Sequence, residues 1–166
     1  MRTQNGDPYN TVGIVGSFRR HLPEITKAHR MFTDAGFKVL APRVIREVVD
    51  PTAEFVLFEG EKDDPVALEG GYQGALLESD AVVCCNPNGY IGGSVMLELG
   101  RLAGERRAEV YFTDPPAEPV INAMAKKVLS IVSVEELIER MTGHNEVLSW
   151  REWPDDDRSA GTNFSL

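Results

Sequence analysis

The sequence predicts a doubly wound α/β protein, Rossmann-like or flavodoxin-like, in which helices flank a five-stranded parallel sheet. Short apolar segments rich in β-branched residues alternate about five times with segments of helical spacing, an order typical of βα units. The segment 81–85, AVVCC, is apolar on both faces, as expected of a central strand that helices cover on each side. Together these patterns favour a sheet whose ligands bind beyond the carboxyl ends of its strands.

The predicted elements follow the chain in simple order. Strands are expected at 11–16, 38–41, 81–85, 109–112 and 129–132. Helices are expected from Pro23 to just before Gly36 and at 65–79, 93–104, 118–128 and 134–141. The segment 47–60 is ambiguous, with a further strand at 53–58 as one interpretation. At 166 residues and 42% apolar content, the chain fits a single domain over 1–150 followed by an acidic tail at 151–166.

Composition and charge restrict the partners. The formal net charge is −9 at pH 7 and the pI is near 4.8. Because DNA and RNA are bound by neutralising many phosphates at once, a nucleic-acid polymer is not expected, whereas a few arginines can hold one small anion. No run of residues approaches the ~20 apolar positions of a membrane helix, and the first ten residues lack the apolar core of a signal peptide. We therefore expect a cytoplasmic protein that does not enter a membrane.

The cysteines and histidines do not predict a metal or a cofactor. Cys84 and Cys85 are adjacent in an expected strand, so their side chains point to opposite faces and are read as small buried hydrophobic groups. The histidines His21, His29 and His144 have no ligand-like spacing.

Two polar loops follow neighbouring predicted strands. In GSFRR, at 16–20, main-chain N–H groups, a serine and two arginines can converge on a phosphate at a helix start, although a tight turn with solvated arginines is an alternative. In NPNGYIGGS, at 86–94, glycines allow a ligand to approach the main chain, and Ser94 is a natural N-cap residue. This loop is longer than a βα turn requires, which favours a binding loop.

Glu98 follows the second loop on the helix that this loop opens. Met96, Leu99 and Ala103 are expected to pack on the sheet, which would place Glu98 at the border of the crevice. An acid near a helix N-terminus that complements the helix dipole or pairs with Arg101 is the ordinary interpretation of this position. A carboxylate at the mouth of a sugar-phosphate site could instead attack an anomeric carbon.

The chain resembles the nucleoside 2-deoxyribosyltransferase superfamily, including its 2′-deoxynucleoside 5′-monophosphate N-hydrolase branch. The similarity runs from about Val12 to Val128 and rests on VGSFRR, SDAVVCCNPNGYIGGS, LELGRLAG and PVINAMAKKV. The resemblance implies that Glu98 is the nucleophile that attacks C1′. It also implies a homo-oligomer, dimer or tetramer, in which Asn122 reaches the site of a neighbouring subunit.

The sequence departs from this family where the leaving base is protonated. The family's transferases carry an aspartate eight residues before the aspartate that opens the central strand, here Asp80, and the corresponding residue is Tyr72. A phenol with an ordinary pKa near ~10 is a poor acid at neutral pH. Glu69, one helical turn earlier, is an alternative, and a solvated helix acid is its ordinary interpretation.

The motifs and the resemblance together define a candidate site. By resemblance, Ser17, Arg19 and Ser94 hold a 5′-phosphate and Phe18 stacks on the base. The candidate catalytic residues are Glu98, Tyr72 and Asp80, and the candidate substrate-binding residues are Gly16, Ser17, Phe18, Arg19, Arg20, Asn86, Gly89, Tyr90, Gly92, Gly93, Ser94 and Asn122. The expected activity is cleavage of the base–sugar bond of a nucleoside 5′-monophosphate or a related nucleotide. Base exchange between nucleosides and nucleotide binding without catalysis are the alternatives.

Overall fold

The computed structural model describes residues 9–46, 48, 58, 64–105, 108–127 and 131–143. Within these residues, the sheet contains four parallel strands in the order β2-β1-β3-β4. The strands are β1 (Thr11–Gly16), β2 (Lys38–Ala41), β3 (Ala81–Cys85) and β4 (Glu109–Phe112). β1 and β3 pair along their whole shared length, from Val12 opposite Ala81 to Gly16 opposite Cys85. The loops that follow these two strands therefore leave the sheet side by side.

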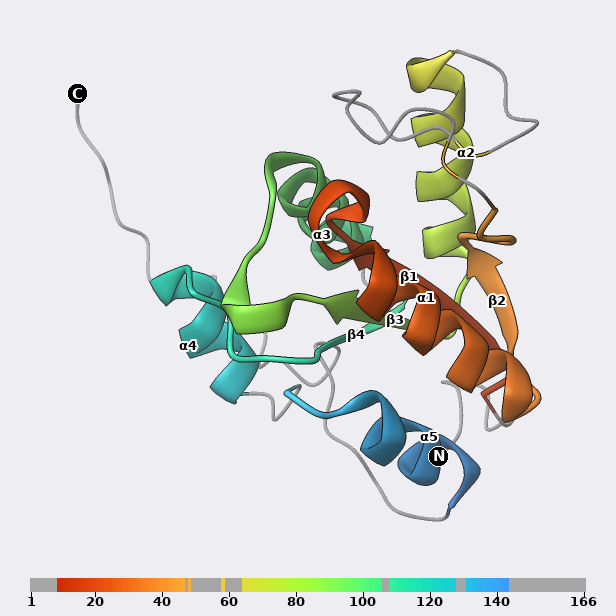
Figure 1. Ribbon diagram of the computed structural model, residues 1–166. Helices are drawn as coiled ribbons and strands as arrows, with labels where there is room; N and C mark the ends of the chain where they lie inside the picture. The colour runs from red at the N-terminus through yellow and green to blue at the C-terminus, as the bar shows by residue number, and fades with distance from the viewer. Residues whose placement is uncertain are drawn as a thin grey trace.

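Helices cover both faces of the sheet, as the sequence predicts. They are α1 (Phe18–Asp34), α2 (Pro65–Leu77), α3 (Gly93–Glu105), α4 (Pro119–Lys127) and α5 (Val134–Thr142), with a short 3-10 helix η1 (Pro87–Gly89) after β3. In Figure 1, α2 and α3 stand in the upper half of the view, and α5 lies at the bottom beside α1. One core cluster joins α1 and α5 to the sheet, and the other joins α2 and α3 to it. The chain is thus a doubly wound α/β protein.

The fifth predicted strand is not formed within the described residues. Ile131 makes a single parallel bridge with Phe112 of β4, and the N–H of Val132 donates to the carbonyl of Phe112 at 2.9 Å. Residues 128–130 lie outside the described part of the chain. Residues 131–132, the described part of the strand predicted at 129–132, thus lie beside β4, but one bridge is too little pairing to make a strand.

Two other predictions fall largely outside the described residues. Of the ambiguous segment, Phe58 forms an antiparallel bridge with Val48, and residues 51–57, most of the optional strand, are not among those described. The acidic tail at 151–166 also lies outside them.

The adjacent cysteines alternate across the sheet, as predicted. Both thiols are free and buried: Cys85 packs in the core with α1 and α5, and Cys84 in the core with α2 and α3. Burial raises the pKa of both thiols, that of Cys85 to about 12. Because the thiolate is the reactive form, both cysteines act as small hydrophobic groups.

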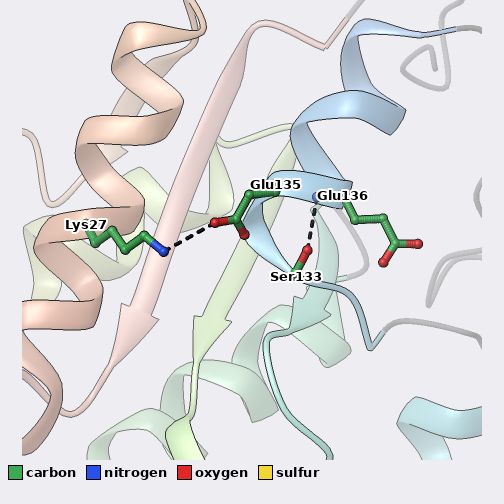
Figure 2. A network of polar contacts seen from close by, with 4 residues as sticks. All are labelled: Lys27, Ser133, Glu135 and Glu136. Carbon is green, nitrogen blue, oxygen red and sulfur yellow. Dashed lines mark hydrogen bonds and ion pairs between the residues drawn. The ribbon is translucent and has the colours of Figure 1, made fainter.

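Polar contacts connect α5 to α1 at the surface. Lys27 Nζ lies 3.2 Å from Glu135 Oε1, and Ser133 caps α5 by accepting a hydrogen bond of 3.1 Å from the N–H of Glu136 (Figure 2). The ion pair is exposed and contributes at most about 1 kcal/mol. Burial of Leu137 and Met141 against the sheet is the larger contribution to docking α5.

Candidate functional site

A cavity of about 330 Å³ opens where β1 and β3 end, a volume within the range of small-molecule sites. It is lined by the start of α1, the loop before α3, and facing positions of α2 and α3. The predicted site residues that line it are Gly16, Ser17, Phe18, Arg19, Arg20, Tyr72, Tyr90, Gly92, Gly93, Ser94 and Glu98. The remaining lining residues are Pro42, Phe58, Leu68, Glu69 and Val95.

The start of α1 presents a helix N-terminus to this cavity. Ser17 occupies the N-cap position, but its hydroxyl makes no capping hydrogen bond. The N–H groups of Arg20 and His21 both donate to the carbonyl of Ser17, at 3.0 and 2.7 Å. The exposed Arg19 lies in the same first turn. Non-helical torsion angles at His21 (φ −125°, ψ 27°) separate this first turn from the rest of α1. A free hydroxyl, a guanidinium group and main-chain N–H groups are suited to an anion.

Tyr90 orders the second arginine. The guanidinium carbon of Arg20 lies 4.2 Å from the centroid of the Tyr90 ring, a cation–π geometry. The ring of His21 meets Tyr90 edge to face at a centroid distance of 5.7 Å. The loop before α3 and the first turn of α1 therefore contact each other directly at the rim of the cavity.

The first half of the loop after β3 anchors the second half. Asn86 is fully buried, and its side chain donates to the carbonyl of Asp114 at 2.7 Å and accepts from the N–H of Asp114 at 3.1 Å. Gly89 packs against Pro115 and Ala117. Neither Asn86 nor Gly89 lines the cavity, so the structure gives both predicted binding residues a supporting position.

The second half of this loop faces the cavity through Tyr90, Gly92, Gly93 and Ser94. α3 begins at Gly93, and the N–H of Met96 donates to the carbonyl of Gly92 at 2.9 Å. Ser94 therefore lies in the first helical turn and not at the N-cap.

Glu98 is more deeply placed than the sequence predicts. The buried positions of α3 are Val95, Glu98, Leu99 and Leu102, whereas Met96 is 39% exposed. The expected packing of Met96 on the sheet is wrong, because the buried stripe is rotated toward Leu102. Glu98 is 6% exposed and its Oε2 has no hydrogen-bond partner within the described structure. Burial, followed by the charge of Glu69, raises the pKa of Glu98 to about 8.

Arg101 does not pair with Glu98. Its Nη1 donates instead to Gln73 Oε1 on α2 at 2.6 Å, and Gln73 Nε2 donates to Glu69 Oε1 at 2.7 Å. This chain of hydrogen bonds connects α3 to α2 and orients the Glu69 carboxylate at the cavity wall.

The phenol of Tyr72 makes a hydrogen bond to the main chain. Its hydroxyl donates to the carbonyl of Ile14 on β1. Burial raises its pKa well above the ordinary value, and the charges of Glu98 and Glu69 raise it further. At neutral pH the phenol is therefore un-ionised, and its one proton is already directed to a carbonyl oxygen.

Asp80 lies at the opposite edge of the sheet, before the amino end of β3. Its Oδ2 accepts hydrogen bonds from the N–H of Asn10 at 3.0 Å and from the N–H and hydroxyl of Thr11 at 2.9 and 2.8 Å. β3 separates it from the cavity by about 16 Å, at about 3.3 Å per residue. Asp80 fastens β1 to β3 and does not line the cavity, so it is not part of the site we propose.

Asn122 is also outside this cavity. It lies half-buried on α4, and its side-chain oxygen is buried with no hydrogen-bond partner among the described residues. That it reaches a neighbouring subunit stays a prediction.

Two of the lining residues outside the candidate set lie on α2, one lies on α3, and the other two lie in the chain between β2 and α2. Glu69 and Tyr72 are three residues apart and so share a helix face, which is the signal that connects Glu69 to the site. Pro42 follows the last residue of β2 and so also lies at the carboxyl end of a strand, where ligands of such sheets bind. Phe58 packs edge to face on Phe18, with ring centroids 5.8 Å apart.

The described residues contain no group of three histidine, cysteine or acidic side chains that could hold a metal ion. None of the described helices is long and apolar enough to cross a membrane.

These features define a doubly wound α/β protein with a polar cavity at the carboxyl edge of its sheet. Among solved structures, the chain is similar to a conserved protein from Enterococcus faecalis V583, with a TM-score of 0.50 and 12% identity over 80% of this chain and 97% of that chain. At this identity the similarity shows the fold alone. No family model and no curated protein sequence matches the chain.

Proposed function

We propose that this protein is an N-glycosidase that cleaves the base–sugar bond of a nucleoside 5′-monophosphate or a related nucleotide. Glu98 is its nucleophile. The observation that carries the proposal is the buried Glu98 carboxyl group, whose Oε2 has no partner among the described residues, in the wall of a cavity that also holds the first turn of α1. A buried polar atom without a partner costs free energy and is therefore uncommon without a function.

The start of α1 would bind the phosphate. Ser17 and Arg19 present donors there, and Ser94 adds a hydroxyl from the first turn of α3. The first turns of α1 and α3 thus border one cavity, and their donors favour a dianionic group. The sugar then lies between this end and Glu98, and its hydroxyl groups supply donors to the unpartnered Oε2. Such donors stabilise the carboxylate form that the reaction requires.

The reaction proceeds in two displacements. A carboxylate oxygen of Glu98 bonds to C1′ while the C1′–N bond breaks, and its electron pair leaves with the base, which takes up a proton. Water then bonds to C1′ and gives up a proton, and the ester bond to Glu98 breaks with its electron pair returned to the carboxylate. The products are the free base and the sugar 5-phosphate.

Base exchange is the same chemistry with a second base in place of water. Nucleotide binding without catalysis is a separate candidate, and one observation favours it: Tyr72, at the family's acid position, donates its hydrogen bond to the carbonyl of Ile14. These candidates differ in what happens to C1′ after binding, so product analysis separates them.

The experiment compares the wild-type protein with Glu98→Gln. Each is incubated with ribo- and deoxyribonucleoside 5′-monophosphates of the common bases, and free base is measured by chromatography. We expect release by the wild type and a loss of at least about 1,000-fold in Glu98→Gln, because removal of a covalent nucleophile removes the pathway. Glu105→Gln, the same change at the exposed end of α3, is the matched control and should match the wild type.

Two further arms distinguish the alternatives. With an acceptor base present, a new nucleotide identifies a transferase. Calorimetric binding of nucleotides without release of base identifies a binding module and contradicts catalysis. Equal rates in the wild type and Glu98→Gln would exclude Glu98 as the nucleophile.

A further inference from the structure

We propose that Glu69 is the acid that protonates the departing base and the base that then activates water. This inference rests on the proposed function and names a second catalytic residue for it. The leaving nitrogen of a nucleobase requires a proton as the C1′–N bond breaks, so a donor must stand in the cavity with Glu98.

Tyr72 is poorly placed for this role. A phenol has one proton, and that of Tyr72 is held in a hydrogen bond to the Ile14 carbonyl, which is part of the sheet and cannot rotate away. Transfer of this proton would also leave a phenolate near Glu98 and Glu69. The negative charges of both carboxylates disfavour this phenolate. Tyr72 instead forms part of the cavity wall.

Glu69 lies one helical turn before Tyr72 and lines the same cavity. Gln73 holds its Oε1 through a hydrogen bond of 2.7 Å, and Arg101 in turn holds Gln73 at 2.6 Å. The carboxyl group is therefore oriented from both α2 and α3. Of the described side chains that line the cavity, only Glu69 and Glu98 are carboxylic acids, and Glu69 is near enough to act electrostatically on Glu98.

The two carboxyl groups take different roles, Glu98 as nucleophile and Glu69 as acid and base, and together they carry one proton. In the reacting complex, the proton is on Glu69 and the charge is on Glu98, whose Oε2 accepts hydrogen bonds from the sugar. Glu98 bonds to C1′, the C1′–N electron pair moves to the base, and Glu69 gives its proton to the base nitrogen. Glu69, now a carboxylate, takes a proton from water as the water oxygen bonds to C1′ and the C1′–Glu98 bond breaks. The pair ends in its starting state, with one proton on Glu69.

The test compares two leaving groups in the first turnover. One substrate is the nucleoside 5′-monophosphate that the wild type cleaves fastest. The other is the p-nitrophenyl glycoside 5-phosphate of the same sugar, whose leaving group, p-nitrophenolate, is a stable anion that needs no proton. Glu69→Gln should slow base release by about 100-fold or more and p-nitrophenol release by less than about 10-fold. Glu98→Gln should abolish both.

Glu78→Gln is the matched control, because Glu78 is an exposed acid at the C-cap of the same helix. Equal rates of base release in Glu69→Gln and Glu78→Gln, with Glu98→Gln inactive, overturn the role of Glu69 and leave the proposed function standing. Equal slowing of both substrates by Glu69→Gln indicates a positioning role and also overturns the proposal. If the wild type cleaves neither substrate, the proposed function fails and this inference fails with it.

A second variant tests the water-activating half of the role. In Glu69→Ala, azide should restore turnover of the p-nitrophenyl substrate, because this nucleophile needs no base to attack C1′. The product is the glycosyl azide 5-phosphate, formed as the C1′–Glu98 bond breaks. Absence of this product, in a variant that still releases p-nitrophenol in its first turnover, contradicts the proposal.

Discussion

The hydroxyl of Tyr72 on α2 donates a hydrogen bond to the main-chain carbonyl of Ile14 on β1. β1 pairs with β2 as far as Gly13, which lies opposite Ala41, so Ile14 is one residue beyond the last of these pairs. The phenol satisfies a carbonyl oxygen at the point where β1 extends past its neighbour. A residue that the family resemblance assigns to acid catalysis is thereby used to join a helix to the sheet.

Removal of this hydroxyl should destabilise the fold. Tyr72→Phe leaves a main-chain acceptor without its donor, and we expect the free energy of unfolding in urea to fall by about 1 to 3 kcal/mol. Tyr90→Phe removes the same atom from an exposed ring that makes its described contacts through the ring face and edge. Its unfolding free energy should change by less than about 0.5 kcal/mol. Equal losses in the two variants would show that the Tyr72 hydrogen bond does not stabilise the fold.

Gly89 positions the binding half of the loop after β3. Its φ of +76° lies in the left-handed region, and a Cβ there would stand 2.5 Å from the carbonyl oxygen of Pro115 and 2.7 Å from the nitrogen of Ala117. Gly89→Ala should therefore lower the free energy of unfolding by about 2 kcal/mol or more. Gly100→Ala makes the same change on α3, where nothing lies within 4 Å, and should raise stability by up to about 1 kcal/mol. Thermal and urea unfolding of both variants should show a lower free energy of unfolding for Gly89→Ala and a higher one for Gly100→Ala.

The four strands of the sheet could be predicted because their patterns are local. A run such as AVVCC is apolar at every position, and both faces of β3 are buried. Ligands of such sheets bind beyond the carboxyl ends of the strands. Because β1 and β3 are neighbours, GSFRR and the second half of NPNGYIGGS were expected at one site, and both line the cavity. Placement by this rule requires only the order of the strands.

Side-chain directions could not be predicted, because they depend on the rotation of each helix. A rotation by one residue, about 100°, replaces Met96 with Val95 on the buried face of α3 and moves Glu98 from the rim into the wall. In α2, three glycines and apolar residues on all sides leave no pattern that shows which face Glu69 occupies. The hydrogen bonds between Asp80 and Thr11 join residues 69 positions apart, a pairing that no spacing in the sequence reveals.

Arg19 should decide between nucleotides and nucleosides. In the proposed complex it contacts the 5′-phosphate, so Arg19→Met should raise the KM for a nucleoside 5′-monophosphate by about 10- to 100-fold, the range for loss of a hydrogen bond between charged groups. The KM for the corresponding nucleoside should stay unchanged. Arg30→Met, at an exposed position of α1 outside the cavity, is the control. A parallel rise in both KM values would place the phosphate elsewhere.

The buried Glu98 should make stability fall as pH rises. The folded protein keeps the Glu98 proton up to a pKa of about 8, whereas the unfolded chain releases it near 4.5. Between these values the folded state binds more protons, so the free energy of unfolding decreases with pH, on the order of 1 kcal/mol per pH unit, and the decrease ends above pH 8. Urea unfolding from pH 4 to 9 should show this slope in the wild type and in Glu105→Gln, and its loss in Glu98→Gln.

The same pKa gives the activity a pH dependence with a defined sign. A nucleophilic carboxylate must be ionised, so kcat/KM for the p-nitrophenyl substrate, whose leaving group needs no proton from Glu69, should rise about tenfold per pH unit as pH approaches the Glu98 pKa of about 8. The substrate phosphate titrates near pH ~6, about two pH units below the Glu98 pKa, so its ionisation does not overlap the rise in kcat/KM. Because the charge of Glu69 contributes to the raised pKa, Glu69→Gln should move the rising limb to lower pH when p-nitrophenol release is followed. Glu78→Gln should leave the limb in place, and an unshifted limb in Glu69→Gln would show that the two carboxyl groups are not coupled.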